Sequence, residues 1–298
     1  MHIHLESGLR LARVSRRSPW LKGLGIVRTV YGAVLPFPEG WTMRVDDFDQ
    51  TLMMDVDPRD IIGINIWHRP ELFEKKEREL FCSAIFPGAI VLDIGANIGI
   101  YTLLAAKRGA RVFAIEADPD NAKTLRHHVE LNGYNDRVTV LEMAATEAEQ
   151  TMTLYRDPTN SGHSNLYSGV VPVRVYGKSV DSLKLPAVDV CKIDVEGSEA
   201  GALRGMVRTI SNSPRLRMLI EHSAQFGHTS EMMSFLRQHF TDISVAGRGA
   251  LGSESTPPRF CNLWVSGARV ETGCGSSDYP QNEGSNVVLH VCQGANDD

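Results

Sequence analysis

A glycine-rich turn between a buried strand and a helix is the feature that most constrains the fold of this chain. It lies in the segment Val91–Thr102, with the sequence VLDIGANIGIYT. Gly95 and Gly99 bracket Asn97; glycine lets a backbone approach a ligand closely, and the start of a helix offers unpaired N–H groups. Asp93 ends the strand, and its carboxylate would repel a phosphate and attract an ammonium or sulfonium group. The turn therefore predicts a binding loop for a ligand that carries positive charge.

The turn lacks the two common nucleotide-binding patterns. In the dinucleotide fingerprint G-x-G-x-x-G, Asn97 and Ile100 stand where the second and third glycines belong. The Gly-Lys-Ser/Thr ending of a P-loop is also absent. The remaining pattern, D-x-G-x-N-x-G, resembles the first motif of Rossmann-like methyltransferases that use S-adenosylmethionine (SAM). That resemblance implies that Asp93 acts on the amino group of SAM, directly or through water.

Composition indicates an ordinary globular protein. The chain has 298 residues, of which 42% are hydrophobic and 22% charged, and its formal net charge of −5 gives no drive toward nucleic acid. No apolar run approaches the ~18 residues that span a bilayer. The five cysteines are odd in number and lack C-x-x-C spacing, which disfavours zinc. Cys82 and Cys191 fall in a predicted apolar helix and a predicted buried strand, so we expect reduced thiols and a cytoplasmic protein.

The first 28 residues are basic and partly apolar. They carry six arginines and lysines against one acid, Glu6, with leucines and Trp20 between them. Such a segment could lie on an anionic membrane surface or on a partner protein. The alternative is a solvated extension, and its scattered charges make it a poor signal peptide.

From residue 90 onward, apolar strand-like runs alternate with helical patterns. Near-continuous apolar strands separated by helices indicate a parallel sheet covered on both faces. We therefore predict an α/β, Rossmann-like fold with a mostly parallel, seven-stranded sheet. The predicted strands are Ile90–Asp93, Arg111–Ile115, Val138–Met143, Val188–Ile193, Leu216–Ile220, Ile243–Ala246 and Cys261–Val265.

Two segments interrupt this alternation. Residues 36–75 predict short strands and turns, followed by a helix over about 72–86. Residues 151–182 predict a hairpin inserted around the polar loop 157–169, and loops of that length are often functional. Both segments are expected to frame an acceptor pocket. We therefore divide the chain into an N-terminal extension and β-rich cap (1–70), a catalytic domain (71–265) and a disordered tail (266–298).

Glu116 ends the second strand, 23 residues after Asp93. An acid at about this distance beyond a glycine loop can accept hydrogen bonds from both hydroxyls of a ribose. The alternative, a cap for the next helix, is already provided by Asp118. Met143 and Ala144, at the end of the third strand, stand where such proteins contact adenine.

A second motif covers Val188–Gly205, VDVCKIDVEGSEAGALRG. If the strand continues, Lys192, Asp194 and Glu196 project to one side of it. Three charges at the carboxyl end of a buried strand are costly unless they are paired or belong to a site. An ion pair between Lys192 and Asp194 would explain two of them but not the third.

Together these motifs resemble the FkbM family of methyltransferases over roughly residues 70–245. The resemblance rests on DIGANIGIYT (93–102), Glu116, SVDSL (179–183), KIDVEGSE (192–199) with Leu203 and Gly205, and IEH (220–222). It implies methylation of a hydroxyl on a sugar, glycan or natural product. The implied cofactor-binding residues are Asp93, Gly95, Asn97, Gly99, Tyr101, Thr102, Glu116, Ala117, Met143, Ala144 and Asp194.

An alcohol attacks a methyl group well only if its proton is accepted during the attack. The predicted catalytic residues are Asp194, Glu196, His222 and Lys192, and His163 on the inserted loop could also reach the site. Asp194, Glu196 and Glu221 could alternatively hold Mg²⁺ through oxygen ligands. The second acid pair expected for such a metal site is not evident.

Other functions fit the sequence less well. No D/N-P-P-Y/F or Pro-Cys motif of nucleic-acid methyltransferases is present, and the main domain lacks a basic stripe. A Tyr-x-x-x-Lys pair for a sugar epimerase is also missing. A SAM-fold binding protein without activity, or a transferase such as an aminopropyl transferase, stays open as an alternative.

Overall fold

The computed structural model describes residues 40–157, 165–166, 171–253 and 255–269. The basic segment 1–28, His163 and most of the predicted tail therefore lie outside the described residues. Within the described ranges, no helix is both long enough and apolar enough to span a bilayer.

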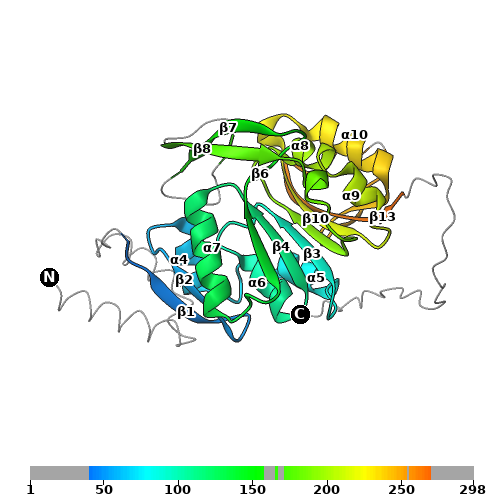
Figure 1. The fold of residues 1–298 in the computed structure, drawn as a ribbon. Helices are drawn as coiled ribbons and strands as arrows, with labels where there is room; N and C mark the ends of the chain where they lie inside the picture. Colours follow the sequence, from blue (N-terminus) through cyan, green and yellow to red (C-terminus); the bar gives the residue numbers. More distant parts are fainter. Residues whose placement is uncertain (1–39, 158–164, 167–170, 254, 270–298) are drawn as a thin grey trace, which may run out of the picture.

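The core of the molecule is a mixed sheet with the strand order β12-β11-β13-β10-β9-β3-β4-β5 (Figure 1). β10, β9, β3, β4 and β5 are parallel, whereas β13 pairs antiparallel with β10 and β11. All seven predicted strands are present, and the fold prediction is confirmed. The sheet has an eighth strand, β12, because the chain turns after β11 and pairs two residues with its edge. The strands are β3 (Ile90–Ile94), β4 (Arg111–Glu116), β5 (Val138–Glu142), β9 (Val190–Ile193), β10 (Arg217–Ser223), β11 (Phe240–Val245), β12 (Gly249–Ala250) and β13 (Phe260–Ala268).

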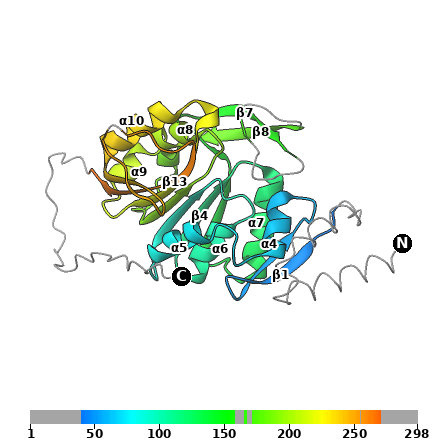
Figure 2. The same ribbon diagram turned by 180° about the vertical axis from the view of Figure 1, so that it is seen from behind.

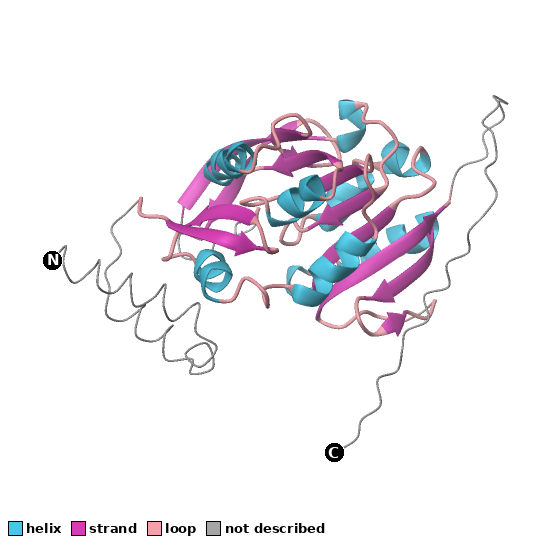
Figure 3. Cartoon of the chain, turned by 90° about the horizontal axis from the view of Figure 1, so that it is seen from below, coloured by secondary structure: helices cyan, strands magenta, loops and turns pink. Residues whose placement is uncertain are grey.

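Apolar side chains of the sheet divide between two faces. Val91 and Val112 pack in one core cluster, whereas their neighbours Leu92 and Phe113 pack in the other, as alternation along a strand requires. Helices lie on both sides of the strands (Figures 2 and 3). The first face packs against α4 (Ile61–His68), α5 (Lys75–Ser83), α6 (Ile100–Lys107) and α7 (Pro119–Leu131). The second face packs against α8 (Glu199–Arg204), α9 (Val207–Ser211) and α10 (Thr229–His239).

Helix α4 corrects the sequence interpretation, which predicted strands and turns throughout residues 36–75. Asp60 caps the helix by accepting a hydrogen bond from the Gly63 N–H at 3.0 Å. Ile66 and Trp67 are buried in the core. The Asp-capped start was the available signal for this helix, and the short apolar run after it does not distinguish helix from strand.

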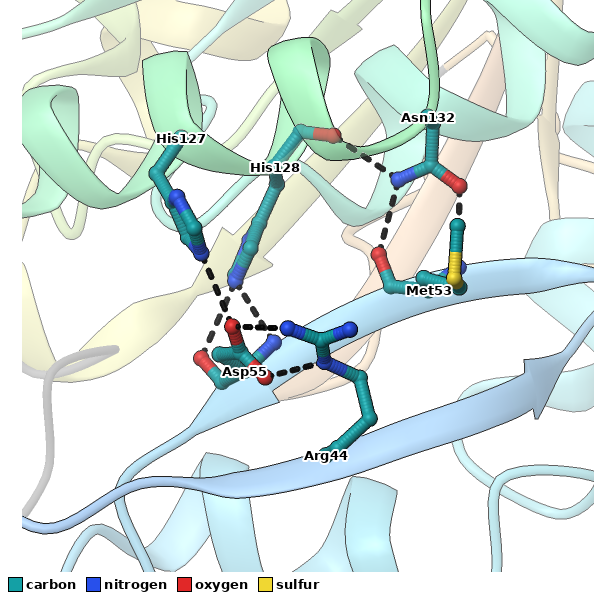
Figure 4. Close-up of polar contacts among 6 residues, drawn as sticks. All are labelled: Arg44, Met53, Asp55, His127, His128 and Asn132. Atoms are coloured by element: carbon teal, nitrogen blue, oxygen red, sulfur yellow. Dashed lines mark hydrogen bonds and ion pairs between the residues drawn. The ribbon is translucent and has the colours of Figure 1, made fainter.

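The N-terminal strands form a ribbon of β1 (Met43–Phe48) and β2 (Leu52–Val56) that packs on α7. Their buried residues share one cluster with the main sheet. His128 of α7 and Asn132, the C-cap residue of that helix, bind the backbone groups at the free edge of β2 (Figure 4). Asn132 accepts from the Met53 N–H at 2.9 Å and donates to the Met53 carbonyl at 2.7 Å. The Nε2 atom of His128 accepts from the Asp55 N–H at 2.9 Å, while its Nδ1 contacts the Ile98 carbonyl at 2.7 Å.

The predicted inserted hairpin is confirmed. β7 (Gln150–Arg156) and β8 (Val171–Lys178) pair antiparallel, and β6 (Ala144–Ala145) adds a short parallel strand to β8. In Figure 1 this three-stranded sheet lies beyond one end of the main strands. Ala144, Leu154 and Val175 form its small apolar cluster, with Ala117 packed against it.

We predict that Asn132→Ala lowers the free energy of unfolding by about 1–3 kcal/mol, because the Met53 N–H and carbonyl lose their side-chain partner. Urea unfolding followed by circular dichroism measures the change. Lys123→Ala, at an exposed position of the same helix, is the matched control and is expected to change it by less than about 0.5 kcal/mol. Equal effects of the two variants would contradict the role of Asn132.

Candidate active site

A cavity of about 310 Å³ opens at the carboxyl ends of the parallel strands. Open α/β sheets bind ligands at this edge. Its walls come from the loop after β3, the ends of β4, β9 and β10, helix α4 and the inserted hairpin. The predicted cofactor residues that line it are Gly95, Asn97, Tyr101, Glu116, Ala117, Met143, Ala144 and Asp194.

The glycine loop passes unusually close to the end of β9. Gly95 has φ +78°, and a Cβ atom at this position would lie 1.7 Å from the backbone oxygen of Asp194. Only glycine fits both the backbone conformation and the approach. Gly99 has φ +99° and faces Leu125 of α7, whose Cδ1 would lie 2.3 Å from an added Cβ. Because it has no side chain, Gly99 lets α7 pack closely against the loop. Among the described residues, Gly99 is not one of those that line the cavity.

Glu116 connects the glycine loop to the loop that follows β4. Its Oε2 accepts from the Asn97 N–H at 2.7 Å, and its Oε1 accepts from the Asp118 N–H at 2.8 Å. Burial raises the pKa of the carboxyl to about 7, although these two N–H groups favour the ionised form. Each oxygen retains a lone pair that a ribose hydroxyl could use.

Asp93 lies behind the cavity wall. The residue is 1% exposed, and the Thr102 hydroxyl donates to its Oδ2 at 2.6 Å. Burial raises the pKa of Asp93 to about 6. Among the described residues neither side chain lines the cavity, because both point between β3 and α6. Their hydrogen bond holds α6 behind the loop, and the expectation that Asp93 acts on the amino group of SAM, directly or through water, stays a prediction.

Three carboxylates of the cavity wall meet beside the end of β9. Asp194, Glu196 and Glu221 each offer an oxygen, and these oxygens lie within 4.8 Å of one another. Asp194 and Glu196 lie close together as the sequence predicted, but strand alternation is not the reason for Glu196. β9 ends at Ile193 and Glu196 has φ +48°, so a turn places its side chain, and strand alternation does not. Burial, together with the charges of Asp194 and Glu199, raises the pKa of Glu196 to about 8.

Lys192 supplies a buried positive charge beside this cluster. Its Nζ lies 3.0 Å from Asp194 Oδ2, 3.9 Å from Glu221 Oε2 and 5.1 Å from the centre of the Tyr101 ring. Burial opposes its charge, but the surrounding carboxylates outweigh burial and raise the pKa of Lys192. The ammonium therefore stays protonated and cannot act as a base. The ion pair with Asp194 that the sequence suggested is present.

Glu74 is a cavity residue that sequence reasoning missed. It precedes α5, far from every motif, and only the packing of α5 against α6 brings it to the site. The Tyr101 hydroxyl donates to its Oε2 at 2.7 Å. Burial raises the pKa of Glu74. Tyr101, predicted to contact cofactor, thus also orients a carboxylate in the cavity wall.

His222 is not at the cavity, contrary to the prediction that it acts as a base. It is 3% exposed, its Nε2 lies 3.4 Å from the Thr229 hydroxyl of α10, and burial lowers its pKa. Neighbouring residues of a strand face opposite sides, so Glu221 faces the cavity and His222 faces α10. Glu221 takes the place expected for His222. The charge of Asp194, together with burial, raises the pKa of Glu221.

The family comparison covers most of the segments that form this cavity. The methyltransferase FkbM domain matches residues 93–242, which is half of the chain. This range includes the glycine loop, Glu116 and the Asp194, Glu196 and Glu221 carboxylates, but excludes Glu74.

Individual relatives share shorter stretches. The hexuronic acid methyltransferase AglP of Haloferax volcanii is 26% identical over 131 residues, which cover 41% of this chain and 52% of that protein. An arginine N(omega)-methyltransferase of Streptomyces achromogenes is 31% identical over 122 residues, or 39% of this chain and 32% of that protein. The chain therefore spans about half, or less, of the length of these relatives.

Among solved structures, the FkbM methyltransferase of Methylobacillus flagellatus has 20% identity and a TM-score of 0.41, covering 71% of this chain and 62% of that one. An O-methyltransferase of Thermotoga maritima has 14% identity and a TM-score of 0.41, covering 66% and 67%. With the family match over half of its length and a parallel sheet that ends in a glycine-loop cavity, the chain belongs to the FkbM family of SAM-dependent methyltransferases.

Proposed function

We propose that this methyltransferase acts on a hydroxyl oxygen of a sugar, glycan or natural product. The observation that carries the proposal is the pair of cavity carboxyls, Glu196 and Glu221, whose pKa values are raised. A base that titrates near the working pH suits removal of an alcohol proton.

The cofactor is proposed to lie along the glycine loop. The backbone of Gly95 and Asn97 borders the cavity there, and Glu116 offers its carboxylate to the two ribose hydroxyls. Ala117, Met143 and Ala144 form an apolar wall suited to the adenine. When bound, SAM supplies a methyl group attached to a positively charged sulfur, and this sulfur is a good leaving group.

The other residues prepare the acceptor. Glu221 or Glu196 accepts the hydroxyl proton as the oxygen attacks. Lys192 is a fixed cation that holds Asp194 and offsets part of the acidic charge. Ile61 and Leu166 add apolar side chains to the cavity wall.

A nitrogen acceptor is the second candidate. One relative is named an arginine N(omega)-methyltransferase, and the carboxylates of Asp194, Glu196 and Glu221 would attract a guanidinium. Incubation with SAM labelled in the methyl group distinguishes the two classes. We expect label on neutral hydroxylated acceptors such as glycosides; label on guanidino or amino compounds alone would overturn the proposal.

We predict that Glu116→Gln weakens binding of S-adenosylhomocysteine (SAH) about tenfold or more, since hydrogen bonds to a charged carboxylate are lost. Titration calorimetry measures the Kd. Because ribose hydroxyls favour the ionised carboxyl, whose pKa is about 7 in the empty cavity, wild-type affinity should rise as the pH rises from 6.5 to 8.

In Glu116→Gln this dependence on pH should be shallower, because the amide does not titrate. Glu130→Gln, at an exposed position of α7, is the control and should keep the wild-type affinity and slope. A Glu116→Gln protein with the wild-type Kd would contradict the ribose assignment.

We predict that Glu221→Gln or Glu196→Gln lowers kcat by about 10²- to 10⁴-fold, because the acceptor proton loses its base. The SAH Kd of the same variant should change by less than about twofold. His222→Ala, one residue away on the other face of the sheet, should retain kcat. If both glutamate variants stay fully active, the base is assigned wrongly.

The carboxylate cluster also resembles a site for Mg²⁺, but Lys192 already places a positive charge between Asp194 and Glu221. This ammonium would repel a divalent cation from the same oxygens. We therefore expect treatment with EDTA to leave the rate of methyl transfer unchanged. A loss of rate that Mg²⁺ restores would contradict this expectation.

A further inference from the structure

The inserted hairpin is joined to the helix beyond Glu116 by one arginine. Arg156, the last residue of β7, binds both carboxylate oxygens of Asp118, with Nη2 at 2.5 Å from Oδ1. Its Nη1 lies 2.6 Å from Asp120 Oδ2. Such a bidentate ion pair between a guanidinium and a carboxylate fixes both the position and the orientation of the arginine side chain.

The pair with Asp118 differs from an ordinary surface ion pair. The Asp118 side chain is only 4% exposed, and that of Arg156 is 23% exposed. By contrast, Arg204 binds Glu147 and Glu231, whose side chains are 60% and 51% exposed. Removing Arg156 would leave a buried carboxylate without its counter-charge, which is far more costly than losing an exposed pair.

Asp118 is in turn bound to Glu116. The Asp118 N–H donates to Glu116 Oε1 at 2.8 Å, and Glu116 Oε2 accepts from the Asn97 N–H of the glycine loop at 2.7 Å. A continuous set of hydrogen bonds thus runs from the glycine loop through Glu116 and Asp118 to Arg156.

Close to Arg156, the hairpin also forms part of the cavity wall. Leu154, two residues before Arg156, lines the cavity, as do Asn165 and Leu166. The backbone of Asn165 pairs with Tyr155 in both directions, at 2.7 and 3.0 Å. Arg156 therefore directly follows the residues of β7 that carry this part of the wall.

We propose that Arg156 is a positioning residue that couples the hairpin wall of the cavity to the cofactor carboxylate Glu116. A cofactor ribose bound to Glu116 stabilises the segment that contains Asp118, between β4 and α7. Through Arg156 it also stabilises the hairpin. By thermodynamic reciprocity, the docked hairpin strengthens cofactor binding by the same factor. The coupling rests on the proposed role of Glu116 in SAM binding.

The test compares wild type with Arg156→Met, which keeps an unbranched apolar stem and removes the guanidinium with its charge. Calorimetry gives the SAH Kd, and hydrogen exchange of peptides over 150–156 and 171–178 gives the stability of the hairpin. We expect SAH to slow exchange in both peptides of the wild type. In Arg156→Met we expect a Kd about tenfold weaker and no slowing by SAH.

Three further variants separate coupling from a loss of stability. Arg174→Met removes an exposed arginine from the same hairpin, and Asp120→Asn removes only the exposed partner of Arg156; both should keep the wild-type Kd. Arg156→Lys retains the charge but not the bidentate contact, and should recover part of the affinity.

The outcomes distinguish this proposal from the proposed function. If wild type binds SAH and Arg156→Met binds it equally well, with the same slowing of exchange, the coupling is refuted and the function stands. If Arg174→Met weakens SAH binding as much as Arg156→Met does, the effect is general to the hairpin and the coupling is also refuted. If wild type binds no SAH, the proposed cofactor site fails and the coupling fails with it.

Discussion

The close approach of Gly95 to the backbone of Asp194 is the contact on which the site depends. β3 and β9 are neighbours in the sheet, so the loops that follow them leave the same edge side by side. A side chain at Gly95 would collide with the Asp194 carbonyl and separate those loops. The glycine therefore brings the glycine loop and the carboxylate cluster into one cavity, and a methyl transfer between two ligands requires both to lie close together.

A second constraint is the accumulation of acidic groups in a partly buried space. Burial raises the pKa of Glu74, Glu116 and Glu196, so that some of these carboxyls are neutral near physiological pH. Lys192 offsets part of the remaining charge within the sheet itself. Burial makes these acids costly to ionise. It also raises their pKa values toward neutral pH, where a carboxylate can usefully accept a proton.

Local sequence patterns were sufficient to predict a feature when the residues that form it lie close together in the chain. The strand, turn and helix around Gly95, the cap at Asp118 and the hairpin insertion were all predictable, since each depends on neighbouring residues. Helix α4 was missed because its apolar run is short and its stability comes from packing on the ribbon β1–β2. Glu74 could not be predicted as a cavity residue, because no motif surrounds it.

The sequence by itself determined the α/β fold through the periodicity of its buried strands. Its D-x-G-x-N-x-G turn indicated the class of cofactor, and its resemblance to the family, strongest at KIDVEGSE (192–199), indicated the family. All of these are local properties of the chain. Tertiary structure alone decided which side chains face the cavity. It turned His222 toward α10 and Glu221 toward Lys192, placed Asp93 behind the wall and brought Arg156 to Asp118. The physical reason is that the direction of a side chain depends on strand ends, turns and packing between elements distant in sequence, which no single motif contains.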